Sequence, residues 1–123
     1  MILVDSSVWI DHLRKGESVL GELLNACRVM IHPFIVGEIA CGNLKNRDEI
    51  LTLLQNLPAM PCATDDEVLI FIEKQGLPGK GIGYLDAHLL TSVSLSGTGF
   101  LWTRDKRLLS VAQSLGLSFS AGQ

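Results

Sequence analysis

The sequence has few cysteines and no long apolar stretch. It contains three cysteines, with no pair at Cys-X-X-Cys spacing and no nearby histidine at zinc-finger spacing, which excludes a zinc finger. We interpret Cys27, Cys41 and Cys62 as buried free thiols. No apolar run approaches the roughly 18 to 20 residues that cross a bilayer, so we expect no membrane span.

A secretory signal and an excess of basic residues are also lacking. Residues 1–5 lead straight into the fold without a basic region or a long apolar core, so we expect a cytoplasmic protein. The net charge is −3 at pH 7 and the sequence pI is about 5.5. Taken alone, this charge balance argues against a nucleic-acid partner, whose binding surface is usually basic.

The length and hydropathy of the chain indicate one compact domain. The 123 residues fit a single domain over residues 1–123, because a domain typically takes about 100 to 200 residues. Hydrophobic residues make up 47% and charged residues 19%, and the mean hydropathy is +0.33, which excludes a disordered chain. We expect some of this apolar content to cover a partner or a second copy of the chain.

Short apolar segments alternate with amphipathic segments along the chain. The apolar segments have the length of buried strands and lie at residues 2–4, 29–31, 60–62, 100–103 and 117–119. The segments between them carry apolar residues at three- and four-residue spacing, which predicts helices. No hairpin turn joins consecutive strands. The pattern predicts an α/β fold with a central parallel sheet of four to five strands flanked by helices.

Four acidic residues come from separate segments near the carboxyl ends of these strands. Loops diverge at that edge of an open α/β sheet, so ligands bind there. One acid ends the first strand, one lies in the helix after the second, one begins the helix after a glycine-rich loop, and one follows residues 100–103. We expect these carboxylates to converge: Asp5, Glu38, Asp86 and Asp105.

Such a cluster of carboxylates favours a bound cation, because acids within about 4 to 6 Å of one another repel and raise each other's pKa. Oxygen ligands without His or Cys favour Mg²⁺ or Mn²⁺. Ions of this kind acidify a bound water and clamp the attacking and leaving oxygens of a phosphodiester. The sequence therefore predicts metal-dependent phosphodiester hydrolysis, with the hydroxyls of Ser7 and Thr103 beside the metal.

The acidic pI no longer excludes nucleic acid once these acids are assigned to a metal. Removing four negative charges from a net charge of −3 leaves the rest of the chain at +1. Arg104, Lys106 and Arg107 surround Asp105 and are candidates for contacts with RNA phosphates.

At these residues the chain resembles the PIN-domain ribonucleases, and in particular the VapC-type toxins of toxin-antitoxin pairs. The opening ILVDSSVWI at residues 2–10 resembles the family's first strand and first acid. VGEIACG at 36–42 resembles the second motif, GYLDAHLL at 83–90 the third, and LWTRDKRLL at 101–109 the fourth. The four motifs occur in the family's order and span essentially the whole chain.

The resemblance implies a PIN-like three-layer sandwich and an endoribonuclease that cuts structured RNA, often transfer RNA. It implies that Asp5, Glu38, Asp86 and Asp105 hold Mg²⁺ or Mn²⁺. It also implies a homodimer that a cognate antitoxin protein holds inactive. The departures from the family's pattern are Ser6, where threonine is common, and His88, which is either a substrate contact or a helix-face residue.

Other interpretations of the same residues remain open. Glu38 lies in an apolar segment, where a structural Arg or Lys partner is the alternative to a metal. The acids at 65–67 fit a solvated helix N-terminus. A non-catalytic binding module would keep the acidic pocket without turnover. A phosphoacceptor signalling domain is a further alternative, but it needs adjacent N-terminal acids, whereas Asp5 is followed by Ser6 and Ser7.

Overall fold

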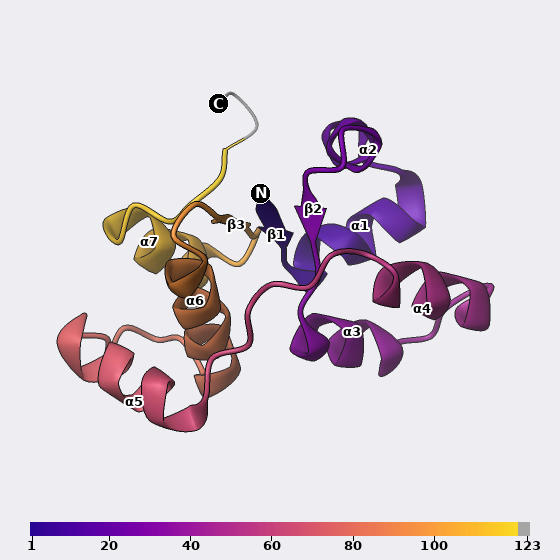
Figure 1. The fold of residues 1–123 in the computed structure, drawn as a ribbon. Helices are drawn as coiled ribbons and strands as arrows, with labels where there is room; N and C mark the ends of the chain where they lie inside the picture. Colours follow the sequence, from indigo (N-terminus) through magenta and orange to yellow (C-terminus); the bar gives the residue numbers. More distant parts are fainter. Residues whose placement is uncertain (121–123) are drawn as a thin grey trace.

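A parallel sheet lies at the centre of the computed structural model, which describes residues 1–120 (Figure 1). Its strands are β1 (Ile2–Val4), β2 (Val29–Met30) and β3 (Phe100–Trp102), in the order β2-β1-β3. Ile2 lies opposite Val29 on one side and opposite Phe100 on the other. Every residue of β1 is fully buried. This explains its unbroken apolar sequence, since a central parallel strand is covered on both faces.

The sheet is narrower than the four to five strands that the sequence predicts, because three strands form within residues 1–120. The remaining two segments reduce to single parallel bridges, Ile31 with Ala59 and Leu101 with Ser118. Pro58 and Pro61 flank the first of these bridges, and proline has no backbone N–H to extend a ladder. The first bridge lies one residue before the expected 60–62 strand, the second lies within the expected 117–119 strand, and each pairs over a single residue.

Helices cover the sheet on both sides, as the α/β prediction requires. In Figure 1 the sheet lies between the helices of the first half of the chain and those of the second half. Among the elements outside the sheet, α1 packs on α3, α3 on α4, and α5 on α6. The helices within residues 1–120 are α1 (Ser6–Lys15), α2 (Ser18–Asn25), α3 (Pro33–Ala40), α4 (Arg47–Gln55), α5 (Asp65–Lys74), α6 (Tyr84–Ser96) and α7 (Lys106–Ser114). The α/β prediction is confirmed.

Several helices begin at the capping residues that the sequence provides. Thr64 starts α5 with a capping box, in which its hydroxyl accepts from the Glu67 backbone and the Glu67 side chain accepts from the Thr64 backbone. His32 caps α3 with its ring, directly before Pro33. Gly97 ends α6 in the left-handed region, with φ of 76°.

The three cysteines are free but exposed, so the prediction that they are buried is wrong. They lie at element ends instead of in the core. Cys27 stands in a turn with φ of 55°, and Cys41 ends α3. Cys62 lies in the irregular segment that leads to α5. No helix in residues 1–120 is long and apolar enough to cross a membrane.

Candidate active site

Asp5 is a buried carboxylate held by two hydroxyl groups. It follows β1 directly, begins α1, and is 6% exposed. Its Oδ2 accepts hydrogen bonds from Ser7 Oγ and Thr103 Oγ1, each at 2.8 Å. β1 and β3 are neighbours in the sheet, so Asp5 and Thr103 meet although they lie 98 positions apart in the sequence.

The same hydroxyls hold the backbone that follows β3. Ser7 Oγ accepts a hydrogen bond from the backbone nitrogen of Arg104 at 3.0 Å. Thr103 Oγ1 accepts from the backbone nitrogen of Asp105 at 3.1 Å. Ser7 and Thr103 thus join the ends of two neighbouring strands and fix the position of Asp105 relative to Asp5.

Asp86 and Asp105 each stand at the start of a helix. Asp105 caps α7, and its Oδ1 accepts from the backbone nitrogens of Arg107 and Leu108, both at 3.0 Å. Asp86 lies in the first turn of α6, and its Oδ2 accepts from the backbone nitrogen of Gly83 at 3.3 Å. The partial positive charge at a helix N-terminus favours a carboxylate at both positions.

Asp5, Asp86 and Asp105 each accept hydrogen bonds through one carboxylate oxygen, and the second oxygen of each accepts none within the described residues. Within the part of the chain that the structure describes, Oδ1 of Asp5, Oδ1 of Asp86 and Oδ2 of Asp105 take part in no hydrogen bond. The side chains are therefore anchored without being saturated. An anchored carboxylate with an open oxygen is the arrangement that a metal ligand or a general base requires.

Glu38 lies on the exposed side of α3, whose core side carries Ile35 and Ile39. Although its segment is apolar, Glu38 is exposed, because the helix turns it away from the side that carries Ile35 and Ile39. Within residues 1–120 no Arg or Lys forms an ion pair with Glu38, so the structural partner considered above is absent. The neighbouring protein nevertheless removes part of its hydration.

The charges of the acids act on one another. Burial is the main cause that raises the pKa of Asp86, and the charges of Asp5 and Asp105 raise it further, against the hydrogen bond from Gly83. Desolvation also raises the pKa of Glu38 most, followed by the charges of Asp5 and Asp86, while a Ser6 hydrogen bond lowers it. The four predicted acids, which come from four segments, therefore lie near enough for their charges to act on one another, and we call them the acid cluster.

The chemistry of this cluster suits a hard divalent cation. Its donors are carboxylate and hydroxyl oxygens, the ligands that Mg²⁺ and Mn²⁺ prefer. Within residues 1–120, however, no three His, Cys, Asp or Glu side chains are placed to hold a metal ion as they stand.

Comparison with known proteins places the chain in a family. No family model matches the chain. Ribonuclease VapC32, from two strains of Mycobacterium tuberculosis, is 47% identical over 120 residues, which cover 98% of this chain and 97% of the relative. The chain belongs to the VapC-type family of PIN-domain ribonucleases. This confirms the resemblance drawn from the four sequence motifs.

Arg104 of this VapC-type chain is already engaged within the protein. Its guanidinium makes ion pairs with Asp11 and Glu17 and lies 5.7 Å from the centre of the Trp102 ring. A cation with two carboxylate partners is less available to a phosphate than an unpaired one. Arg104 therefore ties the end of β3 to α1 and the turn that follows it, and its assignment as an RNA contact stays a prediction.

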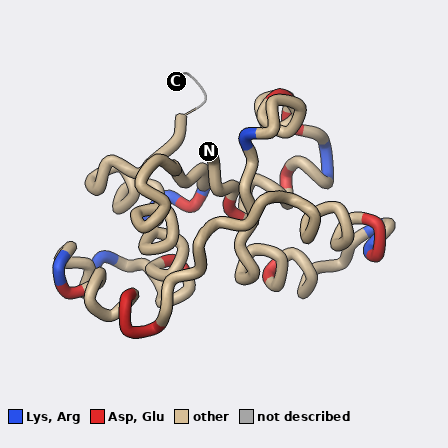
Figure 2. The backbone as a smooth tube through the Cα atoms, in the orientation of Figure 1, with Lys and Arg blue, Asp and Glu red and all other residues tan. Residues whose placement is uncertain are grey.

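Lys106 and Arg107 lie in the first turn of α7, directly after Asp105, and both are exposed. Neither makes an ion pair within the described residues. The Arg107 side chain packs over Gly81 of the glycine-rich loop, where an added Cβ would lie 2.9 Å from Arg107 Cδ. Figure 2 shows that Lys and Arg are spread over separate segments of the chain. Lys106 and Arg107 therefore supply positive charge only locally, next to Asp105.

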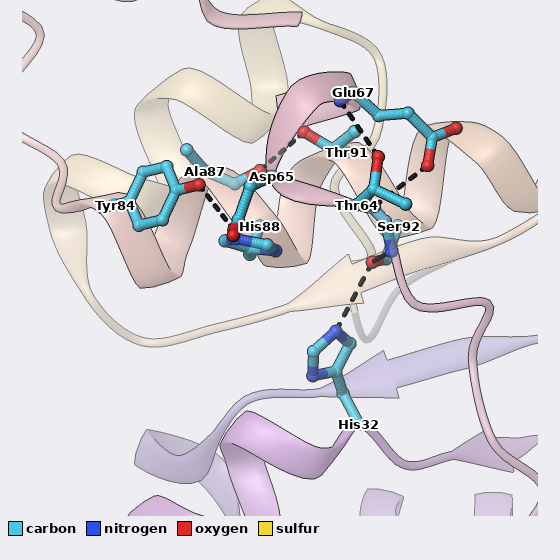
Figure 3. Close-up of polar contacts among 10 residues, drawn as sticks. His32, Thr64, Asp65, Glu67, Tyr84, Ala87, His88, Thr91 and Ser92 are labelled. Carbon is cyan, nitrogen blue, oxygen red and sulfur yellow. Dashed lines mark hydrogen bonds and ion pairs between the residues drawn. The ribbon is translucent and has the colours of Figure 1, made fainter. Parts of the chain in front are cut away.

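A hydrogen-bonded network that the sequence did not predict joins α5 to the first half of α6 (Figure 3). Asp65 Oδ1 accepts from Tyr84 Oη at 2.7 Å and lies 2.9 Å from His88 Nε2. Tyr84 and His88 are one turn apart and flank Asp86 in sequence. The i, i+4 spacing of Tyr84 and His88 was the available signal, but their common partner comes from α5. Asp65 is thus the solvent-exposed acid in the first turn of α5 that the sequence predicts, and it also bonds to two residues of α6.

His88 connects three helices at this point. Its ring is buried and packs edge-on against Tyr84, with ring centres 4.7 Å apart, and against Phe34 of α3 at 4.9 Å. The contacts hold α6, which carries Asp86, against α3, which carries Glu38. This supports the helix-face interpretation of His88 over that of a substrate contact.

Proposed function

We propose that this VapC-type chain is a divalent-metal-dependent endoribonuclease and the toxin of a toxin-antitoxin pair. The observation that carries the proposal is the electrostatic cluster of Asp5, Glu38, Asp86 and Asp105. The relationship to Ribonuclease VapC32 over nearly the whole chain supports the same activity.

In this proposal the four acids hold Mg²⁺ or Mn²⁺, which supplies an acidified water and neutralises charge that develops on the phosphate. The chain's own residues orient the ligands. Ser7 and Thr103 fix Asp5 through one oxygen, and the helix N-termini of α6 and α7 fix Asp86 and Asp105. Lys106 and Arg107 draw the phosphodiester toward the acids, and Arg104 is a further candidate for this contact.

We infer structured RNA, such as transfer RNA, as the substrate and a cognate antitoxin protein as the inhibitor, in the cytoplasm. The family supports both partners. A homodimer is part of the same proposal, because large apolar side chains remain exposed on the described surface, including Leu53, Leu69, Ile70 and Leu95.

Cleavage of total cellular RNA, including transfer RNA, tests the proposal. The purified chain is incubated with Mg²⁺ or Mn²⁺, and in parallel with EDTA. We expect discrete fragments that depend on the metal and that disappear in the Asp86→Asn variant, with at least a 100-fold loss of rate. Asp66→Asn is the matched control, because Asp66 is an exposed acid in the first turn of α5, outside the cluster.

The outcomes separate the remaining interpretations. Metal binding by thermal shift without cleavage of any RNA would indicate the non-catalytic module. Cleavage that survives both EDTA and Asp86→Asn would contradict the metal-dependent mechanism. The phosphoacceptor alternative has no support in the site, because Asp5 is followed by Ser6 and Ser7 and no second acid adjoins it.

A further inference from the structure

A pocket adjoins the acid cluster on the side of Glu38. It has a volume of about 580 Å³ and lies between α1, α3 and the segment that leads into α4. These helices pack side by side in the fold (Figure 1). Glu38 lines this pocket, so the space is continuous with the site of the proposed chemistry. The volume falls within the roughly 300 to 1,000 Å³ of small-ligand sites.

The pocket combines an apolar wall with a polar rim. Ile10 and Leu13 of α1 and Ile50 of α4 supply aliphatic surface. Ile10 is 44% exposed, so this surface is open to an occupant. The flat apolar face of a nucleobase packs on such a wall, while its edges need hydrogen-bond partners.

Two asparagines line the pocket and have unused hydrogen-bonding groups. Asn43 and Asn46 each carry an amide, which offers both donors and an acceptor. Neither side chain makes a hydrogen bond within residues 1–120, and Asn46 begins α4 without using its side chain as a cap. A nucleobase edge presents donors and acceptors together, which an amide matches and a purely apolar ligand does not.

Two basic residues also line the pocket. Arg14 lies in the last turn of α1, and Lys45 lies in the segment before α4. Neither makes an ion pair within the described chain, in contrast to Arg104. Their unpaired charge complements the phosphates on either side of a bound nucleoside.

The segment that carries Asn43, Lys45 and Asn46 is fixed before any ligand binds. The Arg47 guanidinium donates to the backbone oxygens of Ala40 and Gly42, and so fastens the segment to the end of α3. Asn46 holds φ of 53°, a left-handed conformation that few residues other than glycine adopt. A backbone held in this way lowers the cost of ordering a binding site.

We propose that this pocket binds one unpaired nucleotide of RNA beside the phosphodiester that the acid cluster cuts. The base packs on the aliphatic wall and bonds to Asn43 and Asn46, and the flanking phosphates pair with Arg14 and Lys45. This subsite rests on the proposed ribonuclease activity and adds base selection to it. The unpaired cations and unused amides favour a nucleotide over an apolar peptide segment or a second copy of the chain.

NMR titration tests the subsite without requiring cleavage. The ¹⁵N-labelled Asp86→Asn variant in Mg²⁺ buffer is titrated with four RNA tetranucleotides, each of a single base. We expect the side-chain amide signals of Asn43 and Asn46 to shift, and one base to bind at least threefold more tightly than the others. Asn25, at the end of α2, lies outside the pocket and serves as the internal control.

Matched variants test the same contacts by affinity. Asn43→Ala is expected to remove the preference between bases, whereas Asn25→Ala leaves it unchanged. Lys45→Ala is expected to reduce the slope of log affinity against log salt by about 0.7, the value for one phosphate contact on single-stranded nucleic acid. Lys74→Ala, on α5, leaves that slope unchanged.

Three results would overturn the subsite. Unmoved Asn43 and Asn46 signals during RNA binding would leave the pocket to a protein segment such as the antitoxin. Shifts that depend on protein concentration without RNA would assign it to a second copy. Equal affinity for all four bases would remove base selection. Because the titration follows binding alone, loss of RNA cleavage with retained shifts would count against the proposed nuclease and not against the pocket.

Discussion

At the scale of single residues, the hydroxyls of Ser7 and Thr103 have two tasks each. They donate to Asp5 and accept from the backbone that leads into α7. A change at either hydroxyl therefore affects a carboxylate and a backbone amide together. A single hydroxyl oxygen can donate one hydrogen bond and accept another, which is what both positions require.

Thr103→Val retains the shape of the side chain and removes its hydroxyl. We expect the free energy of unfolding to fall by about 1 to 3 kcal/mol, because the Asp105 amide loses its acceptor and Asp5 loses a donor. Urea denaturation in metal-free buffer measures the change. Thr98→Val is the control, because Thr98 is exposed in a turn. Equal stability of the two variants would show that the hydroxyl contributes nothing.

Asp86→Asn removes a repelling charge while keeping an oxygen that can accept from Gly83. A carboxyl with a raised pKa contributes stability that is full below its unfolded pKa of about 4 and is lost as pH rises through its folded pKa. We therefore expect the variant to be more stable than wild type at pH 7 without metal, by about 0.5 to 2 kcal/mol. Chemical denaturation from pH 3 to 8 tests this, and a less stable variant at pH 7 would contradict it.

At the scale of the elements, His32 joins α3 to α6. Its ring is buried, with Nδ1 accepting from the Phe34 backbone at 3.1 Å and Nε2 lying 3.4 Å from Ser92 Oγ (Figure 3). Burial, followed by the charge of His88, lowers the pKa of His32. A neutral ring is therefore part of the contact between the helix of Glu38 and the helix of Asp86.

This contact predicts a pH-dependent stability. The unfolded chain protonates His32 below a pKa of about 6.5, whereas the folded chain, with its lowered pKa, keeps the ring neutral to lower pH. The free energy of unfolding therefore falls as the pH drops from about 6.5 toward the folded pKa. We expect wild type to lose more stability between pH 7.5 and 5.5 than His32→Asn, which keeps a capping side chain. Urea denaturation at the two pH values gives the difference, and equal losses would exclude His32 as the cause.

The order and positions of the elements were predictable, because helix caps and apolar strand segments are local signals. The 60–62 and 117–119 strands were overestimated, since pairing depends on backbone donors that sequence hydropathy does not report. The exposure of Cys41 depends on its place at the end of α3 and not on its residue type.

The candidate site was likewise predictable only in part. The acids were found because each follows a recognisable strand or begins a helix. The hydrogen bonds from Asp65 to Tyr84 and His88 were not found, because they depend on how α5 packs against α6. Nor did the sequence show that Arg104 is engaged by Asp11 and Glu17, since those contacts join segments from opposite ends of the chain.

At the scale of the whole molecule, some of the apolar residues that remain exposed lie together on α5 and α6. Ile70 is 56% exposed and Leu95 is 50% exposed, and both line one hollow of about 260 Å³ between these helices. This hollow lies apart from the acid cluster. It suits contact with a second copy, as the proposed homodimer requires.

Ile70→Asp is expected to weaken self-association at least tenfold, because a charge at the centre of an apolar contact must be desolvated. Sedimentation over a range of protein concentrations measures the effect. Leu53→Asp is the control, since Leu53 is 58% exposed but lies on α4. If Leu53→Asp weakens association and Ile70→Asp does not, the dimer forms through α4 instead.

Because β1 pairs with β3, the candidate site can form on a growing chain only after β3 has been synthesised. The first residues of β1 pair with β3 only after about a hundred more residues are made, and Asp5 meets Thr103 across 98 positions. A nascent chain that has not yet emerged past Asp105 has neither the second hydroxyl on Asp5 nor the helix that begins at Asp105. A ribosome that has not yet synthesised β3 and the start of α7 therefore carries an incomplete acid cluster.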